Sequence, residues 1–225
     1  RQPERSVTDK PNLLIIHTDQ QSSWTIGAYG GTLVDTPNID SLAADGCLFT
    51  NFFVSSAVCT PSRGCLLTGR YPHKHGAYIN NVPLNRDEHT LAHVLGDNGY
   101  STCYIGKWHL DGPEKPGWVP KSRGMGFEEN GLMFNRGHWK SVVDQGGEHP
   151  ELKTDIGDDE TYTTDWLAAQ AVEYIKGHGD TPFFLMLSIP DPHTPFSVRE
   201  LYASMFDPDS MPVPASFREE GRPSW

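Results

Sequence analysis

The chain contains only four cysteines among its 225 residues, which excludes a disulfide-rich scaffold. Cys47, Cys59, Cys65 and Cys103 are too few and too scattered to form a disulfide framework, and their spacing matches no zinc-binding pattern. A free cysteine usually behaves as a small apolar residue, so we expect Cys47, Cys65 and Cys103 to be buried. Cys59 stands in a different context, directly before Thr60 and Pro61.

The sequence also lacks a long apolar run and an excess of basic residues. No stretch has the length that a transmembrane helix needs, so no membrane span is predicted. The formal net charge of −11 argues against general nucleic-acid binding, which needs a basic face. It still permits an anionic substrate, because a local cationic pocket can form on an acidic protein.

The N-terminus shows no recognisable signal peptide. Residues 1–10 are polar, and we expect a flexible lead-in of the kind that removal of a signal peptide leaves. Gly and Pro are frequent, at 22 and 18 residues, which indicates many loops on the scaffold that follows.

Short apolar runs mark the predicted strands. Residues 11–17 and 182–189 are continuous apolar runs, typical of strands buried on both faces of a parallel sheet. Residues 48–54 and 100–105 are predicted as two more strands. Residues 111–159 show little periodicity, and we expect a long surface excursion that shapes a substrate pocket.

Helical patterns alternate with these runs. Residues 36–46, 90–99 and 163–176 each have the start and stop signals or the spacing of a helix. The apolar faces expected to point inward are Ile39, Leu42 and Ala43 in the first helix and Ala168, Ala171, Val172 and Ile175 in the last. The alternation predicts one α/β domain over residues 11–225, with a mainly parallel sheet flanked by helices.

The stretch from Cys59 to Arg70 reads as another helix and its start. Thr60 is a suitable N-cap, Pro61 suits the first helical position, and Gly69 suits the C-terminal stop. Cys59 would then lie just ahead of a helix N-terminus, where unpaired N–H groups favour an anion or a nucleophile. Arg63 adds a fixed positive charge.

Polar residues follow three of the predicted buried strands. Asp19 follows the first strand, Lys107 and His109 follow the second, and His193 follows the third. Because the carboxyl ends of parallel strands lie at one edge of the sheet, we expect these residues to meet Cys59 in one crevice. Among the other histidines, we expect His73 and His75 to lie near the substrate and His138, His149 and His178 to be solvated.

The cysteine stretch resembles the signature of a known enzyme family. Cys-x-Pro-Ser-Arg followed by Leu-Thr-Gly-Arg is the signature of the type I sulfatases, within the alkaline phosphatase superfamily. The matching residues are Cys59, Pro61, Ser62, Arg63, Leu67, Thr68, Gly69 and Arg70. Gly106-Lys107-Trp108-His109-Leu110 looks like the second sulfatase motif, and Asp191-Pro192-His193 looks like a segment that donates another histidine. The resemblance covers residues 11–195 and implies an alkaline-phosphatase-like sulfatase fold.

The resemblance also implies a cofactor at position 59 and a metal beside it. In this family the cysteine is oxidised to formylglycine, so Cys59 would be converted by a formylglycine-generating enzyme or a radical maturase. Asp19 matches an aspartate that binds a divalent cation, usually Ca²⁺, with Mg²⁺ as an alternative, and an oxygen at position 59 would join it. Where many members have two adjacent aspartates, this chain has Thr18-Asp19.

The implied reaction is hydrolysis of a sulfate ester on a sulfated small molecule or saccharide. A diol formed from Cys59 would attack the sulfur, and its second hydroxyl would later expel the sulfate. Arg63, Lys107 and His193 would hold the sulfate and stabilise the transition state. His193 or His109 would protonate the leaving alcohol or assist the diol.

Sulfatases of this family are typically much longer than 225 residues. We therefore expect an N-terminal part of a catalytic domain, with the remaining metal ligands and a second lysine supplied by a C-terminal part. The family also suggests a periplasmic or secreted protein, with the long loop after Asp111 suited to a sulfated polysaccharide. Two alternatives stay open: a phosphonate or phosphodiester hydrolase of the same superfamily, and a non-catalytic anion-binding fragment.

Overall fold

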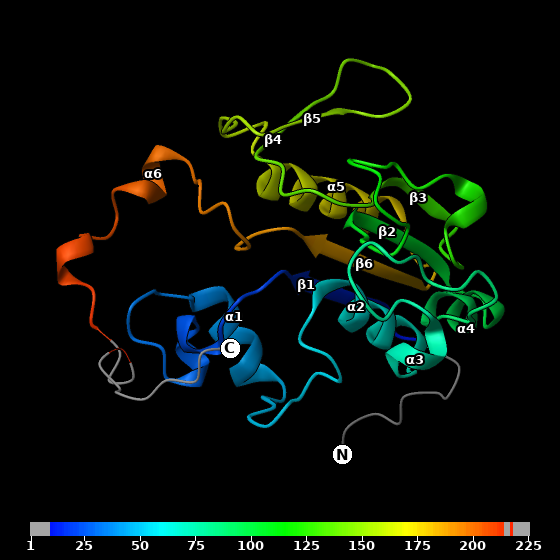
Figure 1. Ribbon diagram of the computed structural model, residues 1–225, viewed down its shortest axis with the longest axis horizontal. Helices are drawn as coiled ribbons and strands as arrows, with labels where there is room; N and C mark the ends of the chain where they lie inside the picture. Colours follow the sequence, from blue (N-terminus) through cyan, green and yellow to red (C-terminus); the bar gives the residue numbers. More distant parts are fainter. Residues whose placement is uncertain (1–9, 214–216, 218–225) are drawn as a thin grey trace.

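A four-stranded parallel sheet forms the centre of the chain, as the computed structural model shows for residues 10–213 and 217 (Figure 1). The strand order is β1-β6-β2-β3, and every neighbouring pair is parallel. The strands are β1 (Leu13–Thr18), β2 (Ser101–Lys107), β3 (Glu129–Phe134) and β6 (Phe183–Ile189). The prediction of an α/β fold with a mainly parallel sheet flanked by helices is confirmed.

The two inner strands, β2 and β6, are the most deeply buried part of the sheet. Six of the seven residues in each are buried, which explains their continuous apolar sequences. Gly106 pairs with Ser188 across the two strands at a φ of 107°. A Cβ atom at Gly106 would lie 2.0 Å from the Ser188 carbonyl oxygen, so only glycine allows this approach.

Helices cover both faces of the sheet (Figure 1). Alternate residues of β6 point to opposite faces, as the period of a strand requires. Phe184 and Met186 join the core beside α2 (Cys59–Thr68) and α4 (Leu91–Asp97), whereas Phe183, Leu185 and Leu187 join the core beside α5 (Thr163–Gly177). The remaining elements are α1 (Pro37–Asp45), α3 (Pro72–His75), α6 (Glu200–Ala203), the short antiparallel pair β4 (Ser141–Val143) and β5 (Glu151–Lys153), and 3-10 turns at Ser23–Thr25, Gly27–Tyr29, Lys121–Arg123 and Pro208–Ser210.

Helix α2 begins earlier than its sequence signals predict. Val58 is the N-cap, so Cys59 is the first helical residue rather than the residue ahead of the helix. Thr60 is not the cap, because its hydroxyl donates to the carbonyl of His109 at 2.8 Å. Gly69 ends the helix in the left-handed region at a φ of 66°, as predicted.

Two segment predictions are wrong. Residues 48–54 form bends and coil rather than a strand, with Phe49, Phe52 and Phe53 exposed. Residues 111–159 are not a surface excursion, because they contain β3, β4 and β5 and contribute buried side chains to both cores. Strand β3 is short and carries Asn130 and Gly131, so the sequence lacks the apolar alternation that marks a strand.

Burial differs from the prediction in β1, α1 and α5. β1 is an edge strand paired only with β6 among the described residues, and Ile16 is 55% exposed rather than buried. In α5 the inward residues are Leu167 and Ala171, whereas Val172 and Ile175 are exposed. Ile39 and Leu42 of α1 are exposed as well, and so is Cys47, whereas Cys65 is half-buried and Cys103 is buried as expected.

The lead-in predicted for residues 1–10 lies outside the described residues except for Lys10. Among the residues that the structure describes, no helix is long and apolar enough to cross a membrane.

Candidate active site

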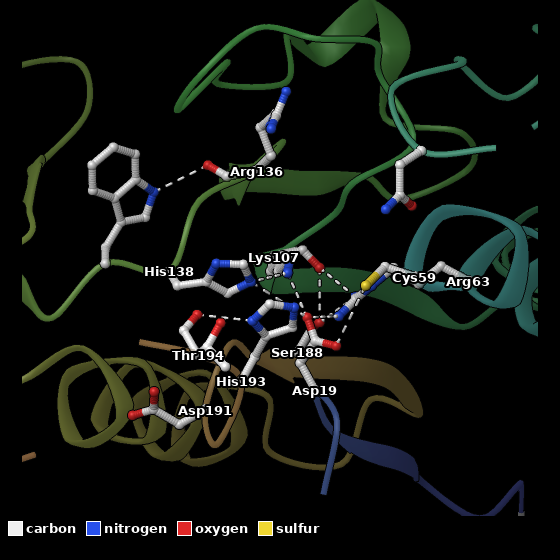
Figure 2. Close-up of polar contacts among 12 residues, drawn as sticks. Asp19, Cys59, Arg63, Lys107, Arg136, His138, Ser188, Asp191, His193 and Thr194 are labelled. Carbon is white, nitrogen blue, oxygen red and sulfur yellow. Dashed lines mark hydrogen bonds and ion pairs between the residues drawn. The ribbon is translucent and has the colours of Figure 1, made fainter. Parts of the chain in front are cut away.

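A cluster of charged side chains lies where β1, β2 and β6 end and α2 begins (Figure 2). Asp19 directly follows β1, Lys107 is the last residue of β2, and Cys59 is the first residue of α2. The structure therefore brings together residues from positions 19, 59, 63 and 107, which the edge rule for parallel sheets leads one to expect.

Asp19 is the centre of this cluster. Its side chain is almost fully buried, forms an ion pair with Lys107, and lies 3.4 Å from the Arg63 guanidinium. The Cys59 Sγ atom lies 3.9 Å from Asp19 Oδ1. Burial alone would raise the pKa of Asp19, but the charges of Arg63 and Lys107 outweigh it and lower the pKa to about 2.

Arg63 is held in place by the strand ends. Its NH1 group donates to the Lys107 carbonyl and to Ser188 Oγ, both at 2.8 Å. The Ser188 hydroxyl donates to the same carbonyl at 2.7 Å, and the Tyr104 hydroxyl does so at 2.6 Å. The guanidinium is thus fixed by β2 and β6, and its NH2 group faces Asp19. Ser188 was not predicted, because it lies inside an apolar strand rather than after it.

Lys107 has a second partner, His138, which the sequence predicts to be solvated. Its Nζ atom is 2.6 Å from His138 Nε2, and the His138 ring stacks on the His193 ring with centroids 3.7 Å apart. Burial lowers the pKa of His138 to about 3, with the Lys107 charge acting in the same direction. The prediction that His138 is solvated is wrong because residues 111–159 pack against the sheet.

His193 and His109 occupy different surroundings. The His193 Nδ1 atom lies 2.8 Å from the Thr194 carbonyl, so Nδ1–H donates this hydrogen bond and Nε2 takes no part in it. His109 is buried, and within the described part of the chain neither of its ring nitrogens has a hydrogen-bond partner. Burial, together with the charges of Lys107 and Arg63, lowers the pKa of His109 to about 3.

The other candidate histidines do not reach this cluster. His75 is buried beneath α2, where its ring packs against Gly64 and lies 3.6 Å from Cys65 Sγ. His73 is exposed and stacks on Tyr71. His149 and His178 are half-buried against Trp118 and Tyr174 rather than solvated.

A cavity of about 340 Å³ opens beside the cluster. Its lining includes Asp19, Cys59 and Arg63, with the half-buried His17 at its side. Burial and the Arg63 charge lower the pKa of His17 to about 4. The cavity thus joins a thiol, a carboxylate and a fixed cation, which suits a small anion.

The described residues supply only part of a calcium site. Asp19, His138 and His193 could each offer one ligand atom, and these atoms lie within 4.8 Å of one another. Ca²⁺ takes six to eight oxygen ligands, whereas this group has one carboxylate and two imidazoles. These residues alone therefore do not fit Ca²⁺, and Asp19 is the one carboxylate among them.

The structure is that of an α/β protein with a cavity lined by Asp19, Cys59 and Arg63 at the carboxyl edge of a parallel sheet. The family model for sulfatases matches residues 11–215, and the chain belongs to the sulfatase family. Its fold is that of the alkaline-phosphatase-like sulfatases, so the resemblance seen in the sequence is confirmed.

Three known proteins illustrate the similarity. An "Ulvan-active sulfatase" of Formosa agariphila is 35% identical over 90% of this chain and 39% of its own length. An "N-acetylglucosamine-6-O-sulfatase" of Bacteroides thetaiotaomicron is 30% identical over 98% of this chain and 38% of its own. The crystal structure of a phosphonate monoester hydrolase of Agrobacterium radiobacter has a TM-score of 0.70 and 28% identity, covering 91% of this chain and 45% of that one. The chain thus spans less than half the length of each.

Proposed function

We propose that this chain carries the nucleophile side of a sulfatase active site, which hydrolyses sulfate esters of sulfated carbohydrates. The observation that supports this most is the position of Cys59 at the start of α2, 3.9 Å from Asp19, whose carboxylate contacts the Arg63 and Lys107 cations. One carboxylate beside two cations leaves a net positive charge, which favours a sulfate group.

The proposed roles follow from the contacts of each residue. A formylglycine at position 59 would supply a hydrated aldehyde, whose hydroxyl is an oxygen nucleophile. Arg63 binds a sulfate oxygen with the guanidinium that Ser188 and the Lys107 carbonyl orient. Lys107 provides a second cation, and both stabilise charge that develops on the sulfate.

Two histidines are proposed for proton transfer. His193 donates its Nδ1–H to the Thr194 carbonyl, which leaves Nε2 for the substrate, and it lies in the same group as Asp19. His109 is tied to α2 through the hydrogen bond from Thr60 to its backbone carbonyl, and both nitrogens of its buried ring are free of partners among the described residues. His193 is proposed to deliver, from Nε2, the proton that the leaving alcohol needs. His109, whose pKa is lowered to about 3, is neutral and is proposed to assist the diol as a hydrogen-bond acceptor.

Asp19 and position 59 are the metal ligands that we propose this chain contributes, with Ca²⁺ or Mg²⁺ as the ion. Since the described residues do not complete such a site, no step of the reaction is assigned to the metal. A maturase that converts Cys59, a C-terminal part that completes the site, and a periplasmic or secreted location complete the proposal.

A second candidate function rests on the similarity to the phosphonate monoester hydrolase. The full-length protein, co-produced with a maturase, should be assayed with 4-nitrophenyl sulfate, with a 4-nitrophenyl phosphonate monoester and with a phosphodiester. We expect the highest kcat/KM for the sulfate ester. A clear preference for the phosphonate or the diester would favour the second function, and no turnover of any ester would favour a non-catalytic anion-binding protein.

A sugar test addresses the substrate class. Release of inorganic sulfate from sulfated mono- and oligosaccharides should exceed release from the aryl ester if the substrate is a carbohydrate. Sulfate release from the aryl ester alone would contradict the carbohydrate assignment while leaving the sulfatase activity in place.

A further inference from the structure

We infer that His138 is a positioning residue, whose Nε2 atom holds the Lys107 ammonium so that one N–H remains for the sulfate bound at position 59. The inference rests on the proposed sulfatase function and extends it to a residue outside the sulfatase motifs. Its basis is the 2.6 Å contact between Lys107 Nζ and His138 Nε2 (Figure 2).

The donors of Lys107 can be counted. An ammonium has three N–H donors and no acceptor, so His138 Nε2 must be the acceptor of this bond and the His138 proton must reside on Nδ1. Asp19 accepts a second bond, and among the described residues these two are the side-chain partners of Nζ. Because the three N–H bonds of an ammonium are tetrahedral, two fixed acceptors determine where the third N–H points.

The chemistry of the acceptor also matters. A second carboxylate at this place would orient Lys107 equally well, but it would cancel the positive charge that a sulfate needs. A neutral imidazole accepts the hydrogen bond and leaves the charge in place. The same lone pair cannot also bind a metal, so His138 is assigned to Lys107 and not to an Asp-His-His metal site.

The His138 ring is held in two ways. It stacks on His193 with an interplanar angle of 10°. The preceding turn is tight, because Gly137 has a φ of 114° and a Cβ there would lie 2.5 Å from the Trp139 ring. The Trp139 indole N–H also donates to the Arg136 carbonyl at 3.1 Å, which closes the turn.

An ion pair joins the two loops that carry the stacked rings. Lys140, two residues after His138, lies 2.5 Å from Asp191, two residues before His193. The rings are therefore anchored to each other through the backbone as well as through the stack. This arrangement fixes the acceptor of Lys107 before a substrate arrives, which is what a preorganised site requires.

A pair of variants separates the acceptor from the ring. In the full-length, matured protein, His138→Phe keeps an aromatic ring on His193 but removes the acceptor, whereas His138→Gln keeps an oxygen acceptor and removes the ring. We expect His138→Phe to raise both the KM for 4-nitrophenyl sulfate and the Ki for inorganic sulfate by about tenfold, the size of one charge-assisted hydrogen bond. We expect His138→Gln to stay within about threefold of the wild type in both constants, because its amide oxygen can accept from Lys107.

The control is His149→Phe, which makes the same exchange in the same segment at a histidine that stacks on Trp118. It should leave KM and Ki unchanged. A purely structural defect lowers the amount of active enzyme, and thus the apparent kcat, without changing KM or Ki.

Wild-type KM and Ki in His138→Phe would overturn the inference, and so would equal increases of KM and Ki in His138→Phe and His138→Gln. Neither result would contradict the proposed sulfatase function. A wild-type enzyme that turns over no sulfate ester contradicts the proposed function and this inference with it.

Discussion

Two lysine–aspartate pairs near the end of β6, each with a buried lysine, differ in how their charges are balanced. Asp191 accepts from Lys140 at 2.5 Å and from the hydroxyls of Tyr162 and Thr164 at 2.7 and 2.9 Å, so one cation and two neutral donors surround it. Asp19 faces Lys107 and Arg63, so one carboxylate meets two cations. The balanced pair joins two loops, whereas the unbalanced pair has an excess positive charge, which in our proposal binds the sulfate.

Of the two pairs, the one formed by Asp19 lies beside Cys59. Figure 2 shows Asp191 turned away from the cluster, whereas Asp19 lies between Cys59, Arg63 and Lys107. The backbone still connects the two pairs, because the Asp19 N–H donates to the Asp191 carbonyl at 3.2 Å. We therefore expect the Lys140–Asp191 pair to support the site without taking part in its chemistry.

The largest expected effect is the loss of turnover on substitution of Cys59, which lies beside Asp19. Cys59→Ala should abolish sulfate-ester turnover in the full-length protein, and Cys59→Ser should do nearly the same, because a serine cannot form a diol. The thermal midpoint should change little, since Cys59 is only half-buried. Turnover assays with 4-nitrophenyl sulfate and melting curves measure both effects.

Cys65→Ala provides the matched control for that prediction. Cys65 is a second half-buried cysteine of α2, but it faces His75 rather than Asp19. Its loss should leave turnover in place. Substantial multiple turnover by Cys59→Ser would count against the diol chemistry.

The next prediction is that one lysine variant loses activity and the other loses stability. Lys107→Met should lower kcat/KM by roughly 100-fold or more, as removal of one transition-state donor does, while stability holds because Arg63 still pairs with Asp19. Lys140→Met should cost about 1–3 kcal/mol of unfolding free energy, since it leaves the Asp191 carboxylate without its cation. Its kcat/KM should fall far less.

Denaturant unfolding and steady-state kinetics of Lys107→Met and Lys140→Met test this difference between activity and stability. If Lys140→Met lost as much activity as Lys107→Met at unchanged stability, the two pairs would not have separate roles.

A smaller effect is expected from pH. His109 has its pKa lowered from 6.5 to about 3 in the folded protein, so the unfolded chain binds a proton there first as pH falls. The stability that a neutral His109 provides is complete above pH 6.5 and is lost progressively toward pH 3. Asp19 behaves in the same sense at lower pH, because its contribution is present above pH 3.8 and is lost as pH falls toward about 2.

Urea unfolding of the wild type and of His109→Gln at several pH values between 7.5 and 4.5 isolates the first of these contributions, because His17 and His138 titrate in both proteins. His109→Gln should show a shallower decline of stability over this range than the wild type. An equal decline in both proteins would mean that His109 is not the group that titrates.

The sequence predicted the order of strands and helices where burial is complete. β2, β6 and α5 lie within one or two residues of their predicted bounds. The apolar runs of β2 and β6 reflect packing on both sides, and α5 has a helical pattern that reflects packing on one side. The meeting of Asp19, Cys59 and Lys107 also follows from the sequence, since it needs only the rule that parallel strands end at one edge.

The errors come from features that no local pattern records. β1 and α1 have apolar sequences, but whether a face is covered depends on what packs there, and Ile16 and Leu42 are exposed. In α5, Val172 fits the helical spacing as well as Leu167 does, and only the position of β6 decides which one is buried. His138 reaches Lys107 from a segment without periodicity, so its part in the cluster required the tertiary structure.

Peptide mass spectrometry across Cys59, in preparations whose specific activity is known, tests the central claim most directly. The account predicts that turnover rises in proportion to the fraction of chains in which residue 59 has the lower mass of formylglycine. A preparation that hydrolyses sulfate esters at full rate with Cys59 present as an unmodified thiol would contradict it.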